Sequence, residues 1–235
     1  MAGYKLGIGG FDDAIGHIKA GSNIMLIGPP MSGKNVILNN IIYAGLENNE
    51  AAVLVSTGET GESVLEWFEQ NGLSIEKHKE RFGIVDCMSK TLGLSVGDTP
   101  LIKRASSPVD LTGIGVKISQ FLSEEFWMKR GIRSTRLCVN SLSTILMYSN
   151  LQTVFRFLHV FTGRIRSANA LGVYILGEGM HDEQSITTLK QLFNGVLEIK
   201  AKNDAYYIRG VGFSAKPTNW FRYEIENGKV SIKGD

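Results

Sequence analysis

The chain has 235 residues, 43% hydrophobic and 20% charged, which is typical of a globular protein with one sizeable α/β domain. Its net charge of +2, from 25 basic and 23 acidic residues, gives no general attraction for nucleic acid. No apolar run approaches the roughly 20 residues of a membrane-spanning helix. The start MAGYKLGIGGFDDAI is acidic where a signal peptide is basic, so we expect a cytoplasmic protein that does not bind membranes.

Alternating strand and helix patterns fill the first 193 residues. Continuous apolar runs predict strands at residues 23–27, 51–56, 82–87, 136–140 and 172–178. Helical periodicity or capping predicts helices at residues 10–15, 34–44, 62–71, 108–129, 151–169 and 185–193. Residues 88–107 show no periodicity, which indicates an irregular insertion.

The end of the chain has a different pattern. Short strands are predicted at residues 195–200, 205–210, 220–226 and 229–232, and the last two are joined by the hairpin signal Asn227-Gly228. Repeated βα units followed by such strands predict an α/β fold. Its central sheet is mostly parallel, with helices on both faces and a β-rich antiparallel C-terminal extension. We expect residues 1–235 to form a single domain.

The two cysteines and four histidines show no metal-ligand spacing. Cys87 and Cys138 lie in strand-like segments without a C-x-x-C pattern, so we expect free buried thiols. No zinc site is predicted.

The clearest motif is a glycine-flanked loop between the first long strand and the helix after it. Gly28, Gly33 and Lys34 fit the phosphate-loop (Walker A) pattern G-x-x-x-x-G-K, in which backbone N–H groups surround phosphates and the lysine contacts the outer ones. An ordinary βα turn is the alternative. The predicted nucleotide-binding residues are Gly28, Pro29, Pro30, Met31, Ser32, Gly33, Lys34, Asn35 and Val36.

The order of motifs resembles the RecA superfamily of ATPases, specifically the archaeal KaiC-like and RadA-paralogue branch. The resemblance covers nearly the whole chain and rests on the sequences GFD, GPPMSGK, GLENNE, RLCVNSLSTIL, VYILGE and FRYEIENGKVSI. It implies a RecA-like P-loop fold that binds ATP at subunit interfaces. It also implies a homo-oligomer, often a hexameric ring, and allows a protein partner.

Two positions depart from the pattern at the metal. Asn35 stands where a Ser or Thr hydroxyl normally contacts Mg²⁺, and Asn140 stands where the family has the Walker B aspartate. Both changes remove oxygens that Mg²⁺ prefers, so Mg²⁺ binding is an open question and hydrolysis is expected to be weak or absent. Whether the chain is an ATPase therefore remains undecided by the sequence.

Three further residues match functional positions of the family. Glu59 follows the second strand, where a carboxylate activates water, although it could instead stabilise the next helix together with Glu62. Arg209 matches the arginine that acts on a neighbouring subunit, or is a solvated strand residue. Glu178 matches a position that senses the nucleotide, or is only a polar strand end.

Three functions follow from these residues. The first is an ATP-binding protein that uses nucleotide occupancy to regulate oligomerisation or partner binding. The second is an active ATPase using Glu59 and Arg209. The third is a DNA-binding RadA paralogue in DNA repair. Its local support is a set of basic residues, which an ordinary solvated surface also explains: Lys129, Arg130, Arg133, Arg136, Arg156, Arg164 and Arg166. The acidic residues 181–184 argue against DNA near the end of the fifth strand.

Overall fold

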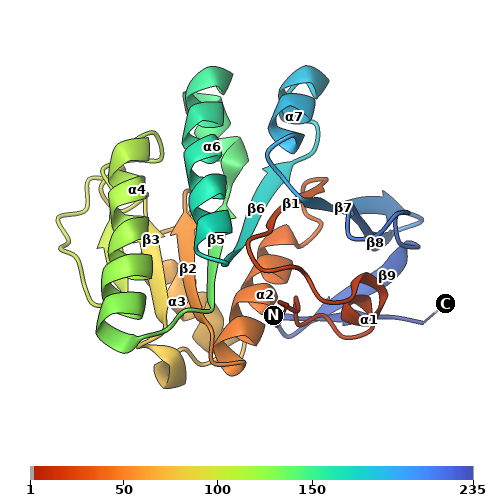
Figure 1. Cartoon of the computed structure of the whole chain (residues 1–235), viewed down its shortest axis with the longest axis horizontal. Coiled ribbons are helices and arrows are strands. Elements are labelled where there is room, and N and C mark those ends of the chain that lie inside the picture. Colours follow the sequence, from red (N-terminus) through yellow and green to blue (C-terminus); the bar gives the residue numbers. More distant parts are fainter. Residues whose placement is uncertain (1–2, 235) are drawn as a thin grey trace.

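The computed structural model describes residues 3–234, and in this range ten strands form one sheet in the order β10-β9-β8-β7-β1-β6-β5-β2-β3-β4 (Figure 1). The strands from β7 to β4 pair in parallel. They are β7 (Gly195–Lys202), β1 (Asn23–Gly28), β6 (Leu171–Gly177), β5 (Thr135–Asn140), β2 (Ala51–Ser56), β3 (Phe82–Asp86) and β4 (Ile102–Arg104). The predicted parallel sheet is confirmed.

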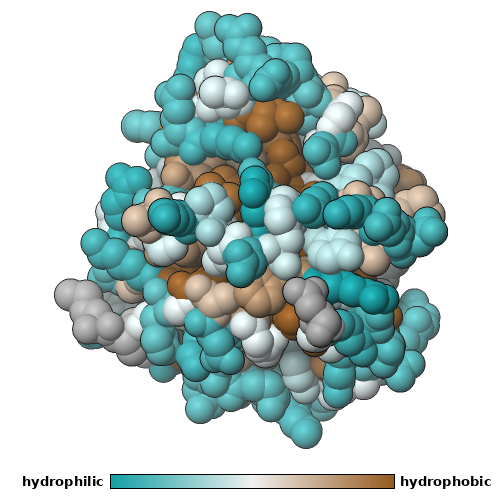
Figure 2. All heavy atoms as spheres, turned by 90° about the vertical axis from the view of Figure 1, so that its right-hand side faces the viewer, coloured by the Kyte–Doolittle hydropathy of each residue, from teal (hydrophilic) through white to brown (hydrophobic). Residues whose placement is uncertain are grey.

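The remaining strands extend this sheet in the antiparallel sense, as predicted. They are β8 (Ala205–Val211), β9 (Phe221–Glu226) and β10 (Lys229–Ile232). Asn227 and Gly228 join β9 to β10 with φ values of 47° and 70°, the left-handed conformation that suits a tight hairpin. Figure 2 views the side of the molecule that carries the C-terminal strands, where most of the surface is hydrophilic.

Helices cover both faces of the sheet (Figure 1). One core lies under α1 (Phe11–Ile15), α2 (Lys34–Glu47) and α3 (Gly61–Gln70). The core on the other face lies under α4 (Leu111–Ser119), the π-helix η2 (Gln120–Met128), α5 (Leu142–Tyr148), α6 (Leu151–Ser167) and α7 (Glu183–Lys190). A single 3₁₀ turn, η1 (Glu76–His78), follows α3. The sheet is therefore the middle of three layers.

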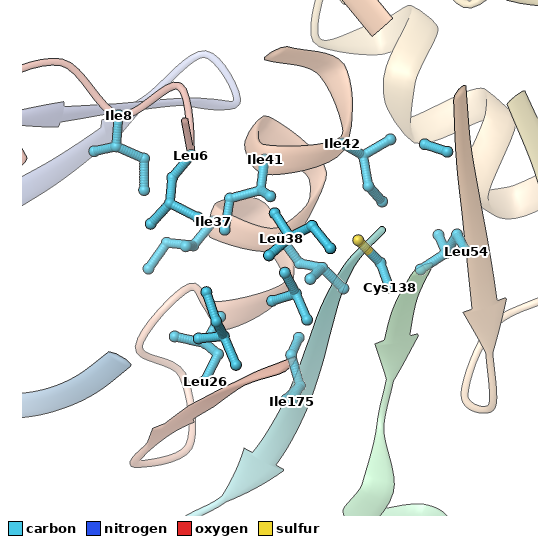
Figure 3. Packing of buried hydrophobic residues seen from close by; sticks show 14 of the residues in the cluster. Leu6, Ile8, Leu26, Ile37, Leu38, Ile41, Ile42, Leu54, Cys138 and Ile175 are labelled. Carbon is cyan, nitrogen blue, oxygen red and sulfur yellow. The ribbon is translucent and has the colours of Figure 1, made fainter. Parts of the chain in front are cut away.

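Helix α2 is the centre of the first core. Its residues Ile37, Leu38 and Ile41 have no exposed surface and point toward the sheet (Figure 3). Leu6 and Ile8, from the segment before α1, close the outer side of the same core. Burying this many aliphatic side chains fixes α2 firmly, so the loop at its N-terminus has a rigid support.

A buried ion pair anchors the other end of α2 to the sheet. It uses Arg136, so this residue is not part of a basic surface that could contact DNA, as the sequence allowed. Arg136 of β5 contacts the carboxylate of Glu50 with N–O distances of 2.5 and 2.9 Å. It also donates to the carbonyl of Ile41 at 2.8 Å. Removing one partner of such a pair leaves a buried charge, which makes the pair important for this junction.

Besides the 3₁₀ turn η1, three elements were not predicted from the sequence. Strand β4 lies within residues 88–107, helix α5 follows β5 directly, and the second half of the predicted helix 108–129 is the π-helix η2. The first two elements span three and seven residues, too short to show a hydrophobic period. A π-helix differs from an α-helix by its i→i+5 hydrogen bonds, which the spacing of apolar residues does not reveal.

Two predictions based on side-chain type can be compared with the structure. Cys87 and Cys138 are free and buried, as expected. Within residues 3–234, no helix combines the length and hydropathy that crossing a bilayer requires.

Candidate functional site

The loop between β1 and α2 has a backbone shaped by left-handed residues. Met31 and Gly33 have φ values of 62° and 73°, and Gly33 is the N-cap of α2. No side chain caps this helix, so the N–H groups of its first turn remain available to an anion. The helix dipole adds positive potential at the same place. The loop is therefore suited to hold a phosphate group.

The two glycines of the motif are also required by packing. A Cβ atom on Gly28 would lie 2.6 Å from the Cβ of Ile199, and one on Gly33 would lie 2.1 Å from the Cδ1 of Ile225. Ile225 belongs to β9, so the C-terminal extension packs directly against the loop. A larger residue at position 28 would displace β7. One at position 33 would push aside only the flexible end of the Ile225 side chain, but it would be strained by the φ of 73°.

Lys34 lies inside the loop. Its Nζ atom donates to the carbonyl oxygens of Gly28, at 2.9 Å, and of Pro29, and lies 3.4 Å from the hydroxyl oxygen of Ser32. Burial lowers the pKa of Lys34, and the carboxylate of Glu178 opposes that shift. An ammonium group held on carbonyls in this way can transfer to phosphate oxygens, which are stronger acceptors.

Glu178 stands immediately after β6, beside the loop. Its backbone N–H donates to the carbonyl of Gly28 at 2.9 Å, while its side chain is exposed. Its carboxylate acts to raise the pKa of Lys34, against the effect of burial. The structure thus brings Gly28, Lys34 and Glu178 together at the carboxyl end of β1 and β6.

Asn140 and Glu59 lie at the carboxyl ends of the neighbouring strands β5 and β2. Asn140 ends β5 and pairs in register with Ser56, the last residue of β2. The backbone N–H and hydroxyl of Thr57 donate to the Asn140 carbonyl at 2.7 and 3.0 Å. Glu59 follows three residues after Ser56, whose hydroxyl donates to the Glu59 carbonyl at 2.7 Å. The Glu59 side chain is exposed, so it is free to reach a ligand at this edge.

The donor set at this edge is poor for a divalent cation. Asn35 is exposed in the first turn of α2, and Asn140 is half-buried. Both offer only neutral amide oxygens, whereas Mg²⁺ prefers carboxylate, phosphate and water oxygens. Among the described residues, no group of three His, Cys, Asp or Glu side chains could hold a metal ion. The loop fits a nucleotide, but the protein groups beside it do not fit tightly bound Mg²⁺.

Arg209 is engaged within its own chain. It lies on β8 opposite Glu198 of β7, and its Nη2 atom is 2.7 Å from the Glu198 carboxylate. Its guanidinium carbon is 4.5 Å from the centre of the Trp220 ring. Tyr207 lies opposite Lys200, whose ammonium also stacks on Trp220 at 4.1 Å. Arg209 is therefore half-exposed, and its charge is paired with Glu198 of its own chain.

Sequence reasoning missed the contribution of the C-terminal hairpin to the loop. Tyr223 of β9 donates a hydrogen bond to the backbone carbonyl of Ser32. Asn40 of α2 donates to the carbonyl of Gly228 at 2.7 Å, and the N–H of Val230 donates back to the Asn40 side chain at 3.3 Å. The hairpin signal at residues 227–228 was visible in the sequence, but nothing there indicated which helix the hairpin would contact.

The fold defined by this sheet and loop is the RecA-like fold of KaiC-like proteins. A KaiC-like protein, PH0186, from the hyperthermophilic archaeon Pyrococcus horikoshii OT3 superimposes with a TM-score of 0.75 at 18% sequence identity. The superposition covers 98% of each chain. At this identity the likeness concerns the fold alone.

Residues 21–199 match DUF7504, a family of unknown function, and the chain belongs to this family. The matched range includes the loop, Glu59, Asn140 and Glu178, and ends before Arg209 and Tyr223. No curated protein matches the sequence.

Proposed function

We propose that the chain is an ATP-binding protein whose nucleotide lies in the loop of residues 28–36. The observation that carries this proposal is the position of Lys34, whose ammonium sits among the loop carbonyls at the uncapped N-terminus of α2. Backbone N–H groups, the helix dipole and a lysine together form a site for a chain of phosphates. The KaiC-like fold supports a nucleotide as the ligand.

Hydrolysis of the bound ATP is slow or absent in this proposal. Phosphoryl transfer depends on neutralising charge at the transferred group, usually by protein-bound Mg²⁺. Asn35 and Asn140 supply no charge at the two positions where the protein would contact that ion. Any Mg²⁺ would be held by the nucleotide and water, with the amide oxygens of these residues as weak additional ligands.

Nucleotide occupancy then serves as a signal. The loop is braced by β9 and adjoins β7, so a ligand that moves the loop also changes the antiparallel extension. Arg209 and Trp220 lie on this extension, where a second copy or another protein could contact them. We propose that the chain acts as one nucleotide-binding domain, and that ATP regulates its homo-oligomerisation, as a hexamer or a smaller assembly, or the binding of a protein partner.

Binding, assembly and hydrolysis can be measured on one purified preparation. Calorimetry with ATP, with and without Mg²⁺, gives the affinity, and sedimentation with and without ATP gives the assembly state. Phosphate release reports hydrolysis, with Lys34→Ala as the background. We expect saturable ATP binding, a change in sedimentation and no release above background. If ATP does not bind at millimolar concentration, the proposal fails.

An active ATPase is the second candidate, favoured by the exposed Glu59 side chain at the same edge as the loop. In that case Glu59 activates water, and Arg209 leaves Glu198 to contact the nucleotide of a neighbouring subunit. Phosphate release that is abolished by Glu59→Gln, and not by Glu66→Gln on the exposed side of α3, would establish this function and overturn the regulatory one. Asp182 and Glu183 lie where the segment after β6 enters α7, so DNA binding gains no support at this end of the sheet.

A further inference from the structure

A large cleft lies at the end of the sheet where the parallel strands begin, opposite the end that carries the phosphate loop. Its volume is about 1310 Å³, and its lining includes Thr135, the first residue of β5, and Glu50, which directly precedes β2. The phosphate loop follows the last residue of β1, and β1 runs in the same direction as these strands. The cleft is therefore separate from the proposed ATP site.

The cleft is lined by apolar and polar residues together. Most of them come from the end of α4, from η2, from the last turns of α6 and from the segment that connects η2 to β5. The main apolar lining residues are Ile118, Leu122, Trp127, Ile132, Val160 and Phe161. Trp127 is 55% exposed and Val160 is 49% exposed, although both belong to residue types that are usually covered. This lining can receive the hydrophobic part of a ligand.

Two arginines without acidic partners stand at the same cleft. The Nη1 atom of Arg164 donates to the hydroxyl of Ser119 at 3.1 Å, and its guanidinium lies 5.1 Å from the centre of the Phe161 ring. These contacts hold its charge at the rim. Within residues 3–234, neither Arg164 nor Arg133 forms an ion pair.

The one carboxylate among the described lining residues is already neutralised. It belongs to Glu50, whose two oxygens are bonded to the buried guanidinium of Arg136. The cleft thus presents two guanidinium groups and no available negative charge. Guanidinium groups bind carboxylates and phosphates with two parallel hydrogen bonds. The arginines of this cleft are therefore suited to bind an anionic group.

The π-helix η2 gives the cleft its shape on one side. Helix α4 passes directly into η2, which spans nine residues and has Ser119 as its N-cap. Ser119, Leu122 and Trp127 line the cleft from this segment. π-Helical turns are rare, and those that interrupt α-helices are found frequently at functional sites. The π-helix therefore supports a binding site here separately from the two arginines and the apolar lining residues.

We propose that this cleft binds an amphipathic organic anion, namely a carboxylate or phosphate joined to an apolar body. The anionic group lies at Arg133 and Arg164, and the apolar body lies along the wall that includes Trp127 and Val160. The site neither requires nor excludes nucleotide in the phosphate loop. Its ligand would therefore be recognised separately from ATP.

The test uses decyl phosphate, below its micelle concentration, as the probe. Calorimetry with the full chain should show saturable binding, whereas decanol, which lacks the charge, and inorganic phosphate, which lacks the apolar body, should bind at least about tenfold more weakly. The double variant Arg133→Gln/Arg164→Gln should weaken decyl phosphate binding at least about tenfold. Arg156→Gln, on α6 but outside the cleft, should leave it unchanged.

A second variant and two further measurements distinguish other occupants. Val160→Asp should also weaken binding, and circular dichroism should show that each variant retains the fold. Sedimentation with vesicles containing phosphatidylglycerol asks whether the anion is a lipid headgroup, and ATP added in competition should not displace the probe. No saturable binding, or equal affinity in the double variant, would overturn the proposal. So would self-association of the chain that the double variant abolishes, because the cleft would then be an interface between copies.

Discussion

The phenol of Tyr223 donates a hydrogen bond of 2.5 Å to the backbone carbonyl of Ser32, and these two residues are 191 positions apart in the sequence. Only 3% of Tyr223 is exposed, and burial raises its pKa, so the group remains a neutral donor. Ile225, on the same strand, fills the space beside Gly33. The C-terminal hairpin therefore holds the phosphate loop in its shape.

Tyr223→Phe removes this hydrogen bond and leaves the Ser32 carbonyl without its donor. We expect the free energy of unfolding to fall by about 1 kcal/mol, and the affinity for ATP to fall about threefold or more because the loop becomes less ordered. Urea denaturation and calorimetry measure the two effects. Tyr206→Phe, the neighbouring ring on β8, is the control. Unchanged affinity in Tyr223→Phe would show that the hairpin does not organise the loop for binding.

Lys34→Ala tests the placement of the phosphates. The variant loses a charge-assisted contact to phosphate oxygens, so we expect ATP affinity to fall by about 100-fold. The fold should remain intact, because the lysine contacts only loop oxygens. Calorimetry gives the affinity and far-UV circular dichroism the fold, with Lys229→Ala on β10 as a control lysine. Wild-type affinity in Lys34→Ala would place the nucleotide elsewhere.

The order of strands and helices could be predicted from the sequence because each long element carries its own hydrophobic pattern. The elements that were missed are short, or they contain a residue whose burial depends on distant partners. Helix α5 has seven residues, and its N-cap Ser141 was its main local signal. Strand β4 contains Arg104, whose side chain is buried by contacts with Glu62 and the carbonyl of Gly97. From the sequence alone, an arginine at this position predicts an exposed segment and not a strand.

The candidate site was predictable where parallel strands end together. The sequence placed Glu59 after a strand and Asn140 and Glu178 at the ends of two others, and the sheet brings those strand ends to one side. The ion pair between Arg209 and Glu198 was not predicted, although the tight turn at Asn203 and Asp204 fixes the register that makes them opposite. Asn and Asp favour such turns, so residues 203 and 204 could have indicated this register from the sequence. The contact of Tyr223 with the loop depends on tertiary packing and has no local signal.

The double variant Asn35→Ser/Asn140→Asp restores a hydroxyl and a carboxylate beside the loop. If the two asparagines are what limits metal binding, Mg²⁺ should then increase ATP affinity about tenfold more than it does in the wild type. Phosphate release should also rise above the background set by Lys34→Ala. Calorimetry over a range of Mg²⁺ concentrations measures the first effect. An unchanged Mg²⁺ dependence would mean that these two positions do not face the metal.

Asp86 stabilises the junction of β3 with the segment after it. Its carboxylate has no exposed surface and accepts hydrogen bonds from the N–H groups of Gly61, Met88 and Ser89 at 2.7–3.0 Å and from the Ser89 hydroxyl at 2.5 Å. Burial acts to raise the pKa of Asp86, but these hydrogen bonds outweigh it and hold the pKa below its usual value. The stability that Asp86 contributes is therefore present above the pKa of the unfolded chain, about 3.9, and is lost as the pH falls through the folded value.

Asp86→Asn should lower the free energy of unfolding by about 2–4 kcal/mol at pH 7, because a neutral amide cannot accept all of these hydrogen bonds and leaves Arg104, whose Nε atom is 3.7 Å from the carboxylate, without this partner. The difference from the wild type should shrink as the pH falls below about 4, where the carboxylate begins to be protonated in the unfolded chain, and further as the pH passes the folded pKa. Urea denaturation at several pH values measures both effects, with the exposed Asp13→Asn as the control. A difference that stays constant from pH 7 into the acid range would show that Asp86 acts through its shape and not through its charge.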